Sequence, residues 1–240
     1  MELKAIILLD EAGLPICRKT IKLKELPMEP LVAAVIGLAN EMGAGDISHA
    51  KFENFSIVFV RGCINKELIL SLITDRVDHL YYLQAIYLMN KLEKKIPKIG
   101  YVVGDRIRKQ ACKIIEDIIP YLTKIPDFIG ESLESALSLL GPFTYSSLMF
   151  LLYRKFDEDP LITLIKNPKK FYKETKSILG TSLDIVIRYA AKFLVNNYKI
   201  KITSDDIIKK FYTLLKLDNL HMMKEFRNLI ELIIDNLILK

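Results

Sequence analysis

The sequence is short of several residue types, and each shortage excludes a class of protein. It has no tryptophan, three cysteines and three histidines among 240 residues. Its 10 glycines and 9 prolines are too few for a collagen-like or low-complexity chain, which argues against long disordered stretches. The longest apolar run, residues 31–39, falls well short of the ~20 residues of a membrane-spanning helix. The first residues lack the basic segment and long apolar core of a secretory signal, so we expect a soluble, cytoplasmic protein.

The three cysteines, Cys17, Cys63 and Cys112, are widely spaced. An odd number of cysteines without a CxxC pair argues against a disulfide framework and against a zinc cluster. We therefore expect buried, reduced thiols, as in a cytoplasmic protein. The many isoleucines and lysines, together with the missing tryptophan, are compatible with a heat-adapted organism.

Charge is distributed unevenly along the chain. Residues 1–97 carry no net charge, and residues 98–240 carry the whole formal charge of +6. Such a change in composition marks a candidate boundary, which predicts one domain over residues 1–97 and another over residues 98–240. The surplus is too small to be a nucleic-acid signature in itself, because dedicated binders concentrate positive charge on one face.

Residues 1–97 alternate between short apolar segments and turn-forming residues, a pattern typical of β-strands. The expected strands are residues 3–9, 14–23, 47–53, 55–62 and 67–75. Gly13 can adopt the positive φ that the first turn requires. One helix is expected to begin at Pro30 and to stop at Gly43 or Gly45, and a second covers residues 78–96. The last three strands are joined by links too short for parallel crossovers, so they must form an antiparallel meander.

Beyond residue 98 the apolar residues recur with the 3.6-residue period of helices, and proline and glycine mark the helix ends. The expected helices are residues 104–119, 128–140, 143–155, 160–166, 168–179, 181–198, 204–216 and 219–238. Pro120 is expected to end the first of them, and Asp159 to cap the helix that begins at Pro160. The sequence thus predicts an α+β protein, with an N-terminal five-stranded antiparallel sheet and flanking helices followed by an all-α helical domain.

The strings AIILLDEAGLPI, LVAAVIGLANEM, KFENFSIVFVRG and LILSLITD, in that order, resemble the longin and roadblock group of small profilin-like domains. The lack of a leading helix favours longin. The resemblance implies a scaffold without catalytic residues that assembles through a helix or a sheet edge and binds or regulates small GTPases. Residues 139–200 resemble, more weakly, a helical module of archaeal proteins of uncharacterised sensory type, which implies an archaeal origin.

The patterns of known catalytic sites are missing. Gly43-Ala44-Gly45 is not followed by Lys-Ser/Thr on a helix, as a phosphate-binding loop requires. There is no GxSxG nucleophile turn, and the three histidines lack the spacing of metal ligands. The acidic cluster Asp157-Glu158-Asp159 could hold a divalent cation, but helix capping by Asp159 is favoured. We therefore expect no enzyme, no catalytic residue, no cofactor and no metal site.

Two helices carry residues that suit a protein interface. Ala33 and Gly37 are four residues apart and form a small-residue strip, which suits either packing on the domain's own sheet or a helix-to-helix dimer contact. Tyr81 and Tyr82 lie on the second helix, and tyrosine is favoured at interfaces because its ring buries area while its hydroxyl stays hydrated. Core packing is the alternative for both tyrosines.

A basic cluster in the helical half surrounds Phe171 and Tyr172. It consists of Lys166, Lys169, Lys170, Lys173 and Lys176. A cationic helix face beside an aromatic ring can meet phosphates or an anionic membrane surface, and the alternative is a solvated face over buried Phe171 and Ile178.

Two functional hypotheses follow. The first is a non-enzymatic scaffold or adaptor whose longin-like domain binds a protein partner, with a small GTPase as the partner class and a homodimer as a further possibility. The alternative is a ligand- or nucleic-acid-binding regulator that acts through the basic helical domain.

Overall fold

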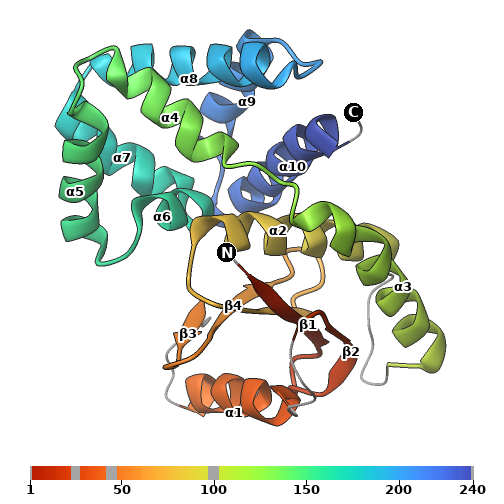
Figure 1. Cartoon of the computed structure of the whole chain (residues 1–240). Coiled ribbons are helices and arrows are strands. Elements are labelled where there is room, and N and C mark those ends of the chain that lie inside the picture. The colour runs from red at the N-terminus through yellow and green to blue at the C-terminus, as the bar shows by residue number, and fades with distance from the viewer. Residues whose placement is uncertain (1, 23–27, 42–47, 97–102, 239–240) are drawn as a thin grey trace. The chain divides into compact units, whose positions relative to one another are not determined.

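Strands are confined to the N-terminal part of the described chain, and helices make up the rest (Figure 1). The structure, a computed structural model, describes residues 2–22, 28–41, 48–96 and 103–238. The chain divides into two units, residues 1–124 and 125–240. The predicted α+β class, with a sheet first and helices after it, is confirmed.

The sheet of the first unit has the predicted five antiparallel strands. They are β1 (Leu3–Leu9), β2 (Pro15–Thr20), β3 (His49–Lys51), β4 (Ser56–Arg61) and β5 (Ile69–Thr74). Their spatial order is β2-β1-β5-β4-β3, and every neighbouring pair is antiparallel, including the predicted meander. Gly13 adopts a φ of 80° in the β1–β2 turn, as expected. The Asp10 carboxylate accepts a hydrogen bond from the Leu14 N–H at 2.8 Å and closes this turn.

Helices cover both faces of the sheet. Helix α1 (Met28–Glu41) packs on one face, where Val32 and Ile36 meet the alternate β1 residues Ala5, Ile7 and Leu9. Helix α2 (His79–Lys95) packs on the opposite face against β4 and β5, and α3 (Asp105–Leu122) packs against β2 and α2 (Figure 1). Strand β1 is therefore covered on both faces, which explains why it is a continuous apolar run rather than an alternating pattern.

Two helix ends near proline residues differ from the sequence expectations. Helix α1 begins at Met28, two residues before Pro30, because the first-turn N–H groups of a helix have no partners and proline is tolerated there. The expected stops at Gly43 and Gly45 lie outside the described residues. Helix α3 continues through Pro120 to Leu122, since a proline in the last turn removes little of the hydrogen-bond ladder.

The division between the units also differs from the composition shift near residue 98. Helix α3 groups with the first unit because it packs on β2 and α2. The side-chain amide of Gln84 in α2 adds a buried hydrogen bond of 3.0 Å to the Leu122 carbonyl at the end of α3. The net charge therefore changes near residue 98, whereas the boundary between the two packed units lies at residue 124.

The second unit contains the seven helices expected there, with ends that differ by at most two residues. They are α4 (Phe128–Ser138), α5 (Thr144–Phe156), α6 (Pro160–Lys166), α7 (Pro168–Leu179), α8 (Ser182–Tyr198), α9 (Ser204–Leu214) and α10 (Asn219–Ile238). The Asp159 carboxylate accepts a hydrogen bond from the Leu161 N–H at 2.8 Å, which makes Asp159 the cap of α6. None of the helices in the described ranges offers a stretch apolar and long enough to span a bilayer.

Candidate functional site

The exposed side chains that the structure describes on the outer face of α1 are uncharged. Pro30, Ala34 and Leu38 are exposed on it, and 58% of Leu38 is accessible to solvent. A Cβ added to Gly37 would meet nothing within 4 Å, so this predicted interface residue borders open space. These positions recur every three or four residues and share one side of the helix, where a surface helix is usually polar.

Ala33, the other residue of the small-residue strip, has a different role. A Cβ added to Gly13 would lie 3.1 Å from the Ala33 Cβ, so the β1–β2 turn packs closely on this alanine. Leu14, the next residue of the turn, is 60% exposed beside it. Ala33 therefore packs within its own domain, whereas Gly37 and Leu38 lie on the outer face of α1.

Tyr81 and Tyr82 are each 1% exposed and belong to the core of the first unit. The Tyr81 hydroxyl donates to Asp75 Oδ1 at 2.7 Å, and the Tyr82 hydroxyl donates to the Ser48 carbonyl at 2.8 Å. Tyr82 Oη also lies 3.1 Å from His49 Nδ1. Core packing, the alternative reading of both tyrosines, therefore describes their surroundings, and we keep only α1 as the candidate protein interface.

We expect Tyr81→Phe to lower the free energy of unfolding at pH 7 by about 0.5–1 kcal/mol, because the acceptor Asp75 is exposed and can rehydrate. Burial is the largest single influence on the pKa of Asp75 and raises it, but the hydrogen bond from Tyr81 and the other favourable contacts of the carboxylate together outweigh burial, so the net pKa lies below the usual value. This contribution is present above the unfolded pKa of about 3.9 and is lost as the pH falls through the lower folded pKa.

Urea unfolding of the wild type and Tyr81→Phe at pH 7 and at pH 2 checks this expectation. The difference between them should shrink at the lower pH. The half-exposed Tyr121 gives the control variant Tyr121→Phe, which should match the wild type at both pH values. A Tyr81→Phe difference that grows in acid would contradict the assignment.

The predicted basic cluster is partly neutralised by acidic neighbours. Lys166 forms an ion pair of 2.8 Å with Glu158, and Lys169, Lys170 and Lys173 are exposed. The Lys170 ammonium lies 5.1 Å from the centre of the Phe156 ring. Nearby, Lys155 and Glu174 form an ion pair of 2.8 Å. The hydrogen bond from Lys155 lowers the pKa of the Glu174 carboxyl, and the charges of Lys173 and Lys170 lower it further.

The acidic cluster is used for local structure. Asp157 ends α5 with a φ of 55°, Asp159 caps α6, and Glu158 accepts a hydrogen bond from the Thr163 hydroxyl at 2.8 Å. Across the described residues, no three histidine, cysteine, aspartate or glutamate side chains come close enough to hold a metal ion.

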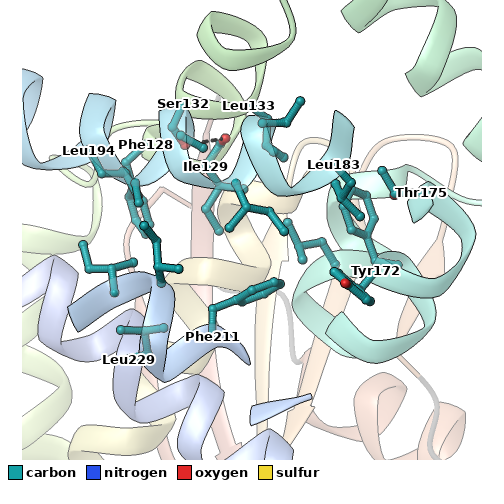
Figure 2. A pocket seen from close by; sticks show the side chains of 18 of the residues that line it. Phe128, Ile129, Ser132, Leu133, Tyr172, Thr175, Leu183, Leu194, Phe211 and Leu229 are labelled. Carbon is teal, nitrogen blue, oxygen red and sulfur yellow. Dashed lines mark hydrogen bonds between the residues drawn. The ribbon is translucent and has the colours of Figure 1, made fainter. Parts of the chain in front are cut away.

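A cavity of about 140 Å³, which no sequence pattern indicates, lies within the second unit. It is lined by residues of α4 to α10, and none of them is charged. Its aromatic residues come from four helices: Phe128, Tyr172 and Phe211, which Figure 2 labels, together with Phe171 and Phe226. In a sequence these residues are indistinguishable from core positions, because each lies on the apolar side of its own helix.

Three hydroxyl groups line the cavity, and two of them are engaged. The Ser132 hydroxyl donates to the Ile129 carbonyl at 3.1 Å, and the Tyr172 hydroxyl accepts from the Lys176 ammonium at 3.1 Å. That hydrogen bond also raises the pKa of Lys176, so the ammonium stays charged. Thr175 is 2% exposed, and its hydroxyl has no hydrogen-bond partner in the described structure.

Another tyrosine next to the cavity wall stays protonated. Burial raises the pKa of Tyr212, and the hydrogen bond that its hydroxyl donates to Asp184 raises it further. Within the described residues, the geometry therefore offers a cavity without charged lining residues and a helix α1 with exposed Pro30, Ala34 and Leu38.

The comparisons with known proteins add no relative. No protein-family model matches the chain, and a search of curated proteins found no significant match.

Proposed function

We propose that this chain is a non-enzymatic adaptor that binds a protein partner through its N-terminal domain. The observation that carries the proposal is the run of exposed uncharged residues Pro30, Ala34 and Leu38 on the outer face of α1. Contact of exposed apolar side chains with water is unfavourable, so their burial against a partner protein favours binding. The strand order β2-β1-β5-β4-β3, with helices on both faces, is compatible with the longin-like domain that the sequence resembles.

The partner to which we commit is a small GTPase. This choice rests on the longin resemblance, which implies such partners, and the α1 face supplies the contact surface. The nucleic-acid alternative is less favoured, since Lys166 already pairs with Glu158 and other lysines of α7 face acidic side chains. A cytoplasmic location stays part of the proposal.

We expect Leu38→Lys to weaken GTPase binding at least tenfold, which corresponds to about 1.4 kcal/mol. The purified small GTPases of the same genome, loaded with GDP or with a non-hydrolysable GTP analogue, serve as partners in calorimetric titrations. A lysine at position 38 places a charge in the centre of an apolar contact, where it must lose its water.

Ile64→Lys is the matched control. Ile64 is 49% exposed in the β4–β5 turn, which packs with α2 on the opposite face of the sheet from α1. This variant should bind like the wild type. Failure of every GTPase to bind in either nucleotide state would refute the partner class. Self-association that Leu38→Lys alone abolishes would instead assign the face to a second copy of the chain.

A further inference from the structure

We propose that the cavity of the helical unit is a binding site for a neutral, ring-sized apolar molecule with one hydrogen-bonding group. The site is independent of the partner-binding proposal, because its lining comes wholly from residues 128–233. The hydroxyl of Thr175, which has no hydrogen-bond partner within the described residues, supplies the polar contact. The cavity is shown in Figure 2, where Tyr172, Phe211 and Thr175 lie around the same space.

The size and lining of the cavity set the class of ligand. A volume of about 140 Å³ is close to that of cavities of ~150 Å³ that stay dry and bind benzene in other proteins. Phe211 and Tyr172 pack edge to face with ring centres 6.3 Å apart, which offers both ring faces and ring edges to an aromatic guest. The absence of any charged residue in the lining excludes an ionised ligand, since a buried charge would have no counter-ion.

Thr175 distinguishes this cavity from a simple packing defect. Several helical hydroxyls of the unit bond to a carbonyl of the preceding turn, as Thr213 does to Lys209 at 2.8 Å. That of Thr163 bonds to the Glu158 carboxylate. Thr175 makes neither kind of bond, although it is buried in the middle of α7. A buried hydroxyl without a partner is costly, and a ligand hydroxyl or carbonyl placed in the cavity removes that cost. A water molecule satisfies it poorly, because water needs two to four polar partners.

Phenol and benzene are the test probes, since they share a ring and differ by one hydroxyl. We expect both to bind the full-length protein in calorimetric or NMR titrations, with phenol the tighter. Thr175→Val removes the hydroxyl with little change in shape. It should weaken phenol binding about fivefold and leave benzene binding unchanged. Ala190→Leu places bulk on the lining and should abolish the binding of both.

Thr163→Val is the matched control, because Thr163 is 1% exposed, lies outside the lining, and donates to Glu158. It should lower the melting temperature and leave the preference for phenol intact, whereas Thr175→Val should leave the melting temperature unchanged or raise it. The proposal is overturned if the wild type binds neither probe, if Thr175→Val does not change the preference, or if Ala190→Leu, shown by circular dichroism to be folded, still binds both.

Discussion

Removal of the disulfide between Cys17 and Cys112 is expected to lower the free energy of unfolding of the first unit by about 3–5 kcal/mol. The two residues are 95 positions apart, so the bond closes a long loop and restricts the unfolded chain strongly. It also corrects the expectation of three reduced thiols, because only Cys63 is outside the bond. Urea unfolding of Cys17→Ala/Cys112→Ala against the wild type measures the loss.

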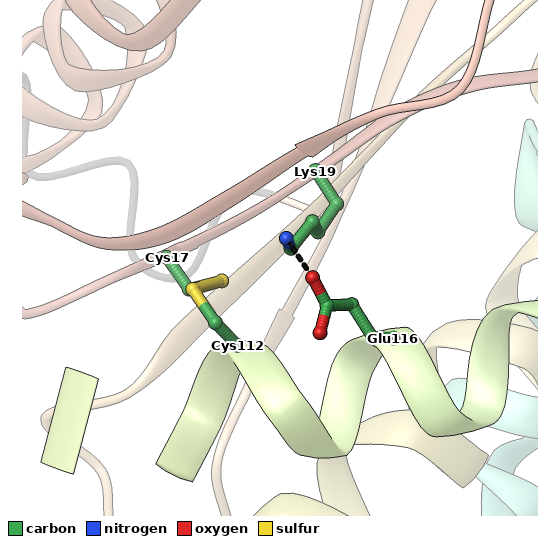
Figure 3. The surroundings of a disulfide bond; sticks show 4 residues. All are labelled: Cys17, Lys19, Cys112 and Glu116. Carbon is green, nitrogen blue, oxygen red and sulfur yellow. Dashed lines mark hydrogen bonds and ion pairs between the residues drawn. A yellow bond between two sulfur atoms is a disulfide. The ribbon is translucent and has the colours of Figure 1, made fainter. Parts of the chain in front are cut away.

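The disulfide joins two elements whose residue spacings match. Cys17 and Lys19 are two apart on β2, a distance of about 6.6 Å along a strand. Cys112 and Glu116 are four apart on α3, about 6 Å along a helix. Both pairs therefore meet (Figure 3), the cysteines as a disulfide and Lys19 with Glu116 as an ion pair. The ion pair is partly exposed and adds little, so the covalent bond dominates the attachment of α3.

Thiol counting provides an independent check. The protein unfolded without reductant should expose one reactive thiol per chain, and three after reduction. Cys63→Ala serves as the control variant and should keep the unfolding difference between oxidised and reduced protein. Three thiols before reduction, in protein prepared without reductant, would contradict the bond.

The disulfide illustrates which features the sequence can predict. Helices α6 and α7 match their predicted ranges because an Asp-Pro and an Asn-Pro step begin them, and such punctuation is local. The pairing of Cys17 with Cys112 is a long-range contact, and the number of cysteines argued against it. Intracellular disulfides do occur in hyperthermophiles, so the bond does not by itself decide the compartment.

The two candidate sites also differ in how far the sequence could predict them. The spacing of Ala33 and Gly37 could suggest a helix contact, but the exposure of Leu38 could not be anticipated, because a helix with apolar residues on more than one side is expected to be largely buried. The cavity could not be anticipated at all, since its walls come from seven helices and Thr175 looks like any other polar residue of α7. Only the packing of the unit shows that its hydroxyl faces apolar neighbours.

The second large effect is expected at Gly62, which directly follows β4. We expect Gly62→Ala to lower the free energy of unfolding by about 3 kcal/mol. An added Cβ would lie 2.2 Å from the Asn65 carbonyl oxygen and 2.5 Å from Glu93 Oε1. The first of these is backbone and cannot rotate away. Chemical unfolding of the variant measures the loss.

Glu93 explains why the turn cannot relax around the new methyl group. Glu93 is 8% exposed. Its carboxylate accepts hydrogen bonds from the Ile64 N–H at 2.7 Å and from the Asn65 N–H at 2.8 Å. Movement of the turn away from a Cβ would break these two charge-assisted bonds, which are stronger than ordinary ones. The strain must therefore remain in the turn or be relieved by losing both bonds.

Gly37→Ala is the matched control, because the same methyl group there meets nothing within 4 Å. Alanine is favoured over glycine in a helix interior, so this variant should stabilise the unit by up to about 1 kcal/mol. The two substitutions add the same atoms to the same domain and should have opposite signs. Equal effects of both would show that glycine content, rather than the Glu93-capped turn, sets the stability.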